Sequence, residues 1–237
     1  MNPNPARRAA LSVGVAVLVV AGCGATDRKV SGTATAPATA SAALTTPTSA
    51  AARPVDDAGL PRLLGSPSEI SDVVGVAMTP EAIFRKPDTR LRVEPIRCIE
   101  AVMPGLDTAS YYSRTGFAGQ LLHSGQHDQV VQVIAAFRTD ADAADFRDMT
   151  ARTWRSCQNQ QATVKGGQTT LTYSLTSVEV VDSVVSVAMS GTARDGTAVP
   201  CQHALGARRN VIIDVRVCTP NVANRGRDLL ARIAAGL

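Results

Sequence analysis

The chain has 237 residues, of which 45% are hydrophobic and only 3% aromatic, and its formal net charge at pH 7 is +4. This length suits one globular domain of ordinary size or two small ones. The chain has a single long apolar run, which excludes a multi-span membrane protein. Its charge is mild and it has no basic clusters interleaved with aromatic residues, which argues against a nucleic-acid partner.

The first 22 residues have the pattern of an export signal. Arg7 and Arg8 precede an apolar stretch at 9–21. A helix over that stretch would reach about 20 Å, too short for a hydrocarbon core of about 30 Å. The pattern is typical of a signal peptide and not of a transmembrane helix, so we expect residues 1–22 to be removed.

The end of this stretch resembles the lipobox of bacterial lipoproteins. An aliphatic residue and two small residues precede a cysteine in Val20-Ala21-Gly22-Cys23. The resemblance implies that the Cys23 sulfur is lipidated, with palmitate among the attached chains, and that the preceding peptide bond is cut. The expected location is the extracytoplasmic face of the cell membrane, with the lipid on Cys23 as the anchor. The alternative is a secreted protein in which Cys23 is incidental.

Residues 23–54 are expected to form a tether that begins at the lipidated cysteine. The run at 33–52 consists almost entirely of Ala, Thr, Ser and Pro, with one Leu and no aromatic residue. Such a composition cannot bury enough apolar surface to offset its ordering entropy, so the tether should be disordered. Both an O-glycosylated stalk and an unmodified spacer fit this composition. Its r.m.s. span of roughly 30 Å would let the domain at 55–237 stand clear of the membrane.

The first half of this domain shows clear local signals. Ser66 and Glu69 form a capping box around Pro67, and Gly75 would end the short helix that follows. Strands are expected at 117–122 and 129–137. Thr139 would cap a helix with Asp140 and Asp142 in its first turn, and Trp154 is placed at the edge of its buried stripe. The stripe is predicted from three- and four-residue spacing to contain Ala143, Phe146, Met149, Thr150, Thr153 and Cys157.

The second half is richer in strands. A hairpin of 171–181 and 184–191 is predicted around Asp182-Ser183, and Asp195-Gly196 is a further turn. A strand at 211–218 and an amphipathic helix at 222–235 complete the chain. Because strands outnumber helices and follow one another directly, the predicted fold class is α+β, with a mainly antiparallel sheet and helices packed against it.

Four further cysteines, Cys98, Cys157, Cys201 and Cys218, predict two disulfides in an exported chain, with three connectivities open. A hairpin centred near Arg209-Asn210 would place Cys201 opposite Cys218, at a separation that a disulfide can span. Cys98 and Cys157 then pair by elimination. No two of these cysteines lie within four residues of each other, so zinc-type spacing is absent and no metal cofactor is expected.

The same residues resemble the PknH-like extracellular sensor domain, a family known from a mycobacterial serine/threonine kinase and from free-standing lipoproteins. The resemblance runs from about Leu60 to Ile233. Its most specific segments are 131–137, 143–146, 154–157, Cys201, 210–215 and Cys218, together with Tyr111 and Gly116. It implies sequential disulfides, an antiparallel sheet with helices against it, and a large cleft for an extracellular ligand that the resemblance does not identify. No kinase signature is found, so a sensor-like module on a lipid anchor is expected.

No set of residues predicts catalysis. His123 and His127 have a metal-like spacing, but Ser124-Gly125-Gln126 between them indicates a turn, where that spacing has no geometric meaning. His203 stands alone, most simply on a strand face. No Gly-x-Ser-x-Gly motif accompanies these histidines.

Three residues are weak candidates for ligand contact. Tyr111 and Tyr112 could line a pocket, although a partly buried aromatic pair explains them as well. Arg208 beside Arg209 could meet an anionic lipid or glycan, although a solvated turn is the simpler interpretation.

The predicted function is a non-enzymatic envelope lipoprotein that binds an unidentified ligand in a cleft. The alternatives are a structural or protein-interaction lipoprotein and a lipid carrier. A large apolar pocket would favour the carrier, and a flat surface would favour the interaction protein. The sequence leaves the oligomeric state open.

Overall fold

The computed structural model describes residues 53–237, with the exception of 107, 109–112, 168 and 193–195. The predicted signal peptide, Cys23, nearly all of the tether, and Tyr111 and Tyr112 therefore lie outside the described residues. Within the described part of the chain, no helix combines the length and apolar character needed to cross a membrane.

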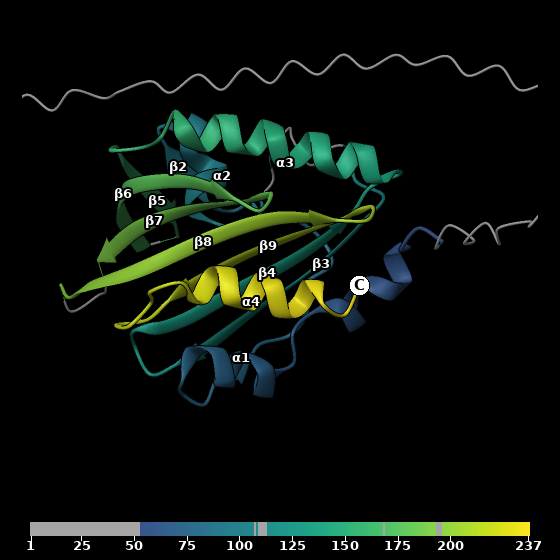
Figure 1. Cartoon of the computed structure of the whole chain (residues 1–237). Coiled ribbons are helices and arrows are strands. Elements are labelled where there is room, and N and C mark those ends of the chain that lie inside the picture. The colour runs from purple at the N-terminus through teal and green to yellow at the C-terminus, as the bar shows by residue number, and fades with distance from the viewer. Residues whose placement is uncertain (1–52, 107, 109–112, 168, 193–195) are drawn as a thin grey trace, which may run out of the picture. The chain divides into compact units, whose positions relative to one another are not determined.

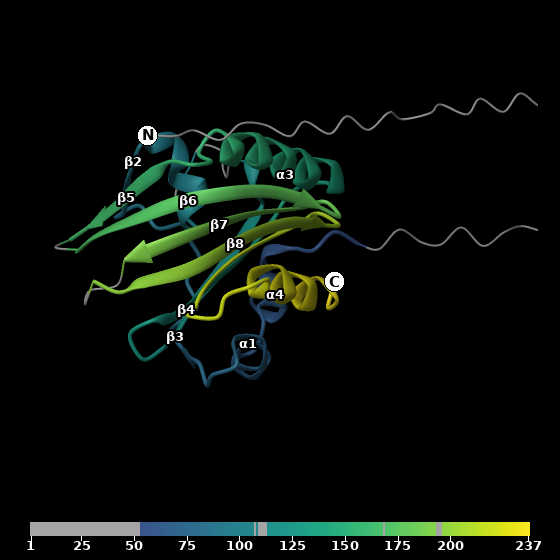
Figure 2. The same ribbon diagram turned by 60° about the vertical axis from the view of Figure 1, so that its left-hand side comes forward.

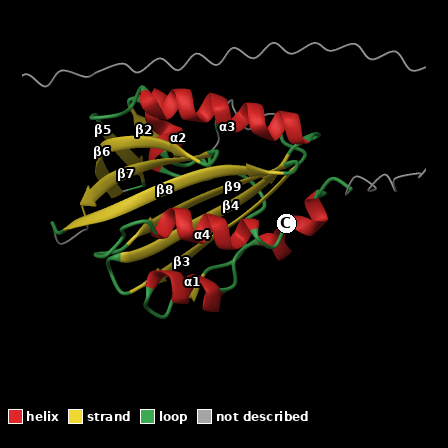
Figure 3. Cartoon of the chain, viewed as in Figure 1, coloured by secondary structure: helices red, strands yellow, loops and turns green. Residues whose placement is uncertain are grey.

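The strands form one sheet of nine in the order β1-β3-β4-β9-β8-β7-β6-β5-β2, and all neighbouring strands are antiparallel (Figures 1 and 3). The strands are β1 (Thr79–Pro80), β2 (Arg92–Glu94), β3 (Gly116–Ser124), β4 (Asp128–Ala136), β5 (Gln161–Gly166), β6 (Thr169–Val181), β7 (Val184–Thr192), β8 (Ala198–Arg208) and β9 (Val211–Cys218). The predicted fold class is confirmed, while β1, β2 and β5 were not predicted.

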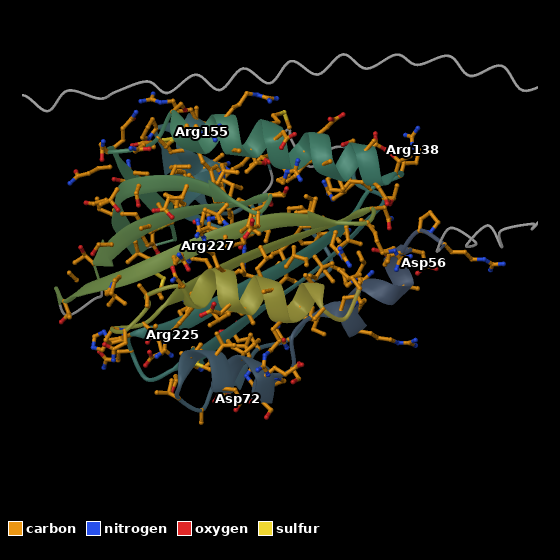
Figure 4. All side chains as sticks on the ribbon, viewed as in Figure 1. Asp56, Asp72, Arg138, Arg155, Arg225 and Arg227 are labelled. Carbon is orange, nitrogen blue, oxygen red and sulfur yellow. A yellow bond between two sulfur atoms is a disulfide. The ribbon has the colours of Figure 1, made fainter. Side chains whose placement is uncertain are left out.

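Helices cover both faces of the sheet. They are η1 (Asp57–Leu63), α1 (Pro67–Val74), η2 (Ile96–Cys98), α2 (Ile99–Val102), α3 (Asp140–Arg155) and α4 (Arg225–Ala234). Figures 1 and 2 show α3 on one face and α1 and α4 on the other. Two apolar clusters follow this division, since one contains residues of α2 and α3 and the other contains residues of η1, α1 and α4. At the start of α4, Arg225 extends toward α1 and donates to the Val73 carbonyl at 2.8 Å (Figure 4).

The two predicted helix caps are confirmed. The Ser66 hydroxyl accepts from the Glu69 N–H, and Gly75 ends α1 in the left-handed conformation at φ 83°. Thr139 and Asp142 form a second capping box at the start of α3. These local hydrogen bonds satisfy N–H groups that a helix start leaves free, which is why short sequence motifs predict them.

The predicted stripe of α3 needs a correction. Met149 is 37% exposed and Thr153 is only half-buried, whereas Trp154 is fully buried rather than at the edge. Each residue turns a helix by about 100°, so Met149 lies about 100° away from its buried neighbour Thr150. The buried face consists of Ala143, Phe146, Thr150, Ala151 and Trp154.

The predicted C-terminal helix is shorter than expected. It begins at Arg225 and not at Val222, because Ala223 has a left-handed φ of 38° that a helix cannot contain.

Both predicted hairpins are present. Asp182 and Ser183 have φ values of 49° and 64°, as the two-residue turns that suit twisted strands require. In the β8–β9 hairpin the strand continues to Arg208, so the turn is shorter than the predicted segment 206–210. The Asn210 amide fixes this turn by donating to the carbonyls of Val55 and Phe137, at 2.9 Å each.

The disulfide prediction is confirmed. Cys201 lies directly opposite Cys218 in the β8–β9 register and is bonded to it, with a Cα–Cα distance of 4.0 Å. Cys98 and Cys157 are also bonded, at 5.7 Å between Cα atoms. This second disulfide joins the η2–α2 turn to the end of α3 across 59 residues of chain.

Candidate ligand-binding groove

A groove of about 560 Å³ opens on the α3 side of the sheet, over β3 and β4. One side is formed by residues 81–91, which we call the wall segment, and the other by residues 103–105 after α2. The wall segment connects β1 to β2, which are the two opposite edge strands of the sheet. The lining residues are Glu81, Ala82, Phe84, Lys86, Pro87, Asp88, Thr89, Arg90, Leu91, Met103, Pro104, Gly105, Leu121, Gln129 and Val131.

The first half of the wall segment is fixed along β3 by backbone hydrogen bonds. The Glu81 N–H donates to the Leu121 carbonyl at 2.8 Å, and Phe84 and Gly119 exchange two bonds of 2.9 Å each. The Phe84 ring occupies the space above Gly119, where an added Cβ would lie 2.4 Å from it. Glycine at position 119 is therefore required for Phe84 to form this end of the groove.

An ion pair fixes the wall segment to η1. Arg85 lies 2.6 Å from the Asp57 carboxylate, whose other oxygen accepts from the Phe117 N–H at 3.0 Å. That backbone hydrogen bond, and to a lesser extent Arg85, lowers the pKa of Asp57. Asp57 thus joins η1, the start of β3 and the wall segment at one point.

The second half of the wall segment is fixed to the opposite side of the groove. The Asp88 N–H donates to the Gly105 carbonyl at 2.9 Å. The Asp88 carboxylate accepts two bonds from the Arg90 guanidinium, of 3.1 and 2.7 Å, and these lower the pKa of Asp88. The pKa of Arg90 is raised in turn by the same contact, so the two side chains form a neutral pair at the rim.

The groove combines an apolar floor with charged rims. Its apolar side chains include Phe84, Leu91, Met103, Leu121 and Val131. Small-molecule sites are typically hollows of roughly 300–1,000 Å³ with mainly apolar linings and a few polar groups that fix orientation. The volume and lining of this groove fall within that range, and its open side suits a ligand with an exposed polar part.

A buried polar cluster lies on the same face of the sheet, beneath α2 and α3. His203 on β8 is fully buried, with Nε2 at 2.5 Å from Asp214 Oδ1 and Nδ1 at 3.0 Å from the Ala101 carbonyl oxygen. The ring of Trp154 packs on His203 at 4.3 Å between centroids. Arg216, directly opposite His203 in the sheet, is also fully buried. Asp214 and Arg216 were not among the predicted site residues, although two charged residues in an otherwise apolar strand are a usable signal.

The structure places the other sequence candidates as follows. His123 lies at the end of β3, with Nδ1 3.7 Å from Glu81, and His127 lies in the β3–β4 turn. Arg208 is exposed at the β8–β9 hairpin and is not among the residues that line the groove. The part of the chain that the structure describes holds no group of three or more His, Cys, Asp or Glu able to bind a metal ion.

Comparison with known proteins gives consistent matches. The family model of the PknH-like extracellular domain matches residues 55–235. The serine/threonine-protein kinase PknH of Mycobacterium tuberculosis is 27% identical over 192 residues, which cover 76% of this chain and 30% of the kinase. The kinase PknJ of the same species is 30% identical over 185 residues, or 73% of this chain and 31% of the kinase. This chain thus spans under a third of the length of these kinases.

The crystal structure of the extracellular domain of PknH from M. tuberculosis has the same fold. It superposes with a TM-score of 0.71 at 24% identity, covering 78% of this chain and 97% of that domain.

Proposed function

Because the chain belongs to the family of PknH-like extracellular domains, we propose that it is a lipid-anchored, sensor-like domain that binds a ligand without converting it. The observation that carries the proposal is the groove of about 560 Å³ between the wall segment and residues 103–105. Backbone hydrogen bonds and an ion pair hold both sides of this groove in place, so the site is formed before a ligand arrives.

The membrane anchor is the first part of the proposal that can be tested. Replacing Cys23 with Ala is expected to move the protein from the detergent phase to the aqueous phase, because the lipid that holds it has no attachment site. Labelling with radioactive palmitate should mark the wild type and not Cys23→Ala. The matched control, Thr33→Ala in the tether, should behave as the wild type does. Equal partitioning of all three proteins would contradict lipidation.

The groove is the second part of the proposal that can be tested. Ala82 is an exposed residue of its lining, so Ala82→Trp should fill the groove at little cost in stability. We expect this variant to lose at least tenfold in affinity for a ligand that co-purifies with the wild type from its own envelope. Native mass spectrometry after mild extraction measures the bound fraction.

The matched control for that experiment is Ala231→Trp, an exposed position on α4 at the other face of the sheet. It should keep the ligand. Retention of the ligand by Ala82→Trp would contradict binding in the groove. A wild type that carries no ligand at all would favour the alternative of a protein-interaction lipoprotein.

A carrier for acyl chains is less well supported. Glu81, Lys86, Asp88 and Arg90 all line the groove, so its apolar floor is flanked by charge. A fully apolar chain would remove water from these groups without replacing their hydrogen bonds. The lining is better matched to a ligand that has both an apolar and a polar part.

A further inference from the structure

Arg216 is a buried cation with no carboxylate partner among the described residues. Its side chain is fully buried, and no carboxylate of the described residues lies within ion-pair distance of it. Its Nη1 donates to the Val102 carbonyl at 2.8 Å and to the Tyr173 hydroxyl at 3.2 Å, and its Nη2 donates to the Gln129 side-chain oxygen. Its Nε is buried without an acceptor. Neutral oxygens alone compensate a buried guanidinium poorly, because they do not cancel its charge.

Asp214, two residues earlier on the same strand, does not supply the missing charge. It is hydrogen-bonded to His203, whose other ring nitrogen faces the Ala101 carbonyl oxygen. Since a carbonyl only accepts, the short contact with Asp214 requires one proton between ring and carboxylate. The His203–Asp214 pair is therefore neutral as a whole and, among the described residues, does not compensate the charge of Arg216.

Gln129 connects this charge to the groove. Its side chain lines the groove and also accepts a hydrogen bond from Arg216. A guanidinium can only donate, so Gln129 must present its oxygen to Arg216 and keep its NH2 group away from it. Among the described residues that NH2 group has no acceptor. As far as the described residues go, the groove therefore has an N–H donor without an acceptor, backed by a positive charge.

Two of the four charged residues of the lining are paired with each other. The carboxylate of Asp88 is already bonded to Arg90, and that of Glu81 lies 3.7 Å from His123. Lys86 is exposed and forms no ion pair with a described residue. Asp88 is thus neutralised by Arg90, while among the described residues neither Lys86 nor Arg216 has a carboxylate within ion-pair distance.

We propose that the groove selects ligands that carry a carboxylate or a phosphate next to an apolar body. The anionic oxygens would accept from the Gln129 amide, with Arg216 behind it as the positioning residue and source of positive potential. The apolar body would pack on Leu121, Val131 and Met103. This inference rests on the proposed function of the groove and specifies the chemistry of its ligand.

The test uses the full chain in a non-ionic detergent at low ionic strength, titrated by ligand-observed NMR. The probes are phenyl phosphate, benzoate, benzyl alcohol, benzylammonium and inorganic phosphate. We expect both aromatic anions to bind at least tenfold more tightly than benzyl alcohol, and benzylammonium to bind most weakly. Phenyl phosphate should also bind more tightly than inorganic phosphate, because a free phosphate does not use the apolar floor.

The decisive variant is Gln129→Glu. The new carboxylate gives Arg216 an anionic partner, so the melting temperature should not fall, whereas affinity for the two anions should fall at least tenfold. Affinity for benzyl alcohol should stay within twofold. The matched control Gln158→Glu makes the same charge change at an exposed position outside the groove and should leave all affinities unchanged.

The possible failures are separable. Equal binding of benzyl alcohol and the anions, or unchanged anion affinity in Gln129→Glu, would overturn the anion site and leave the groove as a binding site. If no probe binds but Ala82→Trp still loses its envelope ligand, the anion site is likewise overturned and the groove remains a binding site. If no probe binds and Ala82→Trp changes nothing, the proposed function falls as well.

Discussion

Replacing Cys98 and Cys157 together with Ser is expected to lower the free energy of unfolding by about 4 kcal/mol. The corresponding loss for Cys201 and Cys218 is about 3 kcal/mol. These values follow from the entropy that each cross-link removes from the unfolded chain, which grows with loop length. The two loops span 59 and 17 residues, so the order of the two losses is fixed by the sequence separation.

Urea denaturation of the two double variants and the wild type measures both losses. The Cys98–Cys157 disulfide also holds the start of α2, whose Ala101 and Val102 carbonyls contact His203 and Arg216. Any weakening of these contacts adds to the loss of stability when this disulfide is removed. Reduction of the wild type provides the control, because it should reproduce the effect of removing both bonds. A larger loss at Cys201–Cys218 would show that the loop model fails for this fold.

Replacing Asp214 with Ala should destabilise the protein by about 3–5 kcal/mol, the range measured when one member of a buried ion pair is removed. Asp214 is 3% exposed and bonded to the fully buried His203, which would lose its partner where water cannot replace it. Asp214→Asn keeps the size and one acceptor oxygen and should lose less. Thermal and urea unfolding of both variants give the comparison.

An exposed ion pair offers the matched control for this prediction. Glu179, whose side chain is 59% exposed, lies 3.0 Å from Arg227. Exposed pairs contribute roughly 0–1 kcal/mol, so Glu179→Ala should fall in that range. Equal losses for Asp214→Ala and Glu179→Ala would contradict a structural role for the buried pair.

Local signals account for the parts of the fold that the sequence predicted. The caps at Ser66 and Thr139 satisfy groups within one helical turn, and the turn at Asp182-Ser183 sets the pairing of the two strands beside it. The register that bonds Cys201 to Cys218 follows in the same way from the β8–β9 turn. In each case the deciding contacts lie within a few residues or across one hairpin.

The groove could not be predicted because its contacts are long-range. The wall segment has neither helical nor strand periodicity, and bonds to β3 and to Gly105 determine its path. In the sequence, Gly119 is only a residue that weakens a strand. Its role follows from the Phe84 ring, which occupies the space that a side chain at position 119 would need. The cleft was expected only from the family resemblance, and Arg208, the ligand-contact candidate among the described residues, does not lie in its lining.

The attachment of the wall segment to both edge strands has a geometric consequence for the whole sheet. Eight interstrand intervals separate β1 from β2, and at about 4.8 Å each they give a flat width of about 38 Å. Phe84 is still bonded to β3, so the chain from there to Arg92 has eight steps, which reach about 28 Å at full extension. Because this reach is shorter than the flat width of the sheet, the two edge strands must lie closer together than in a flat sheet. The sheet therefore curves beneath the wall segment. The number of residues between Phe84 and Arg92 therefore limits the curvature of the sheet, and a longer segment in a related chain would permit a flatter sheet and a wider groove.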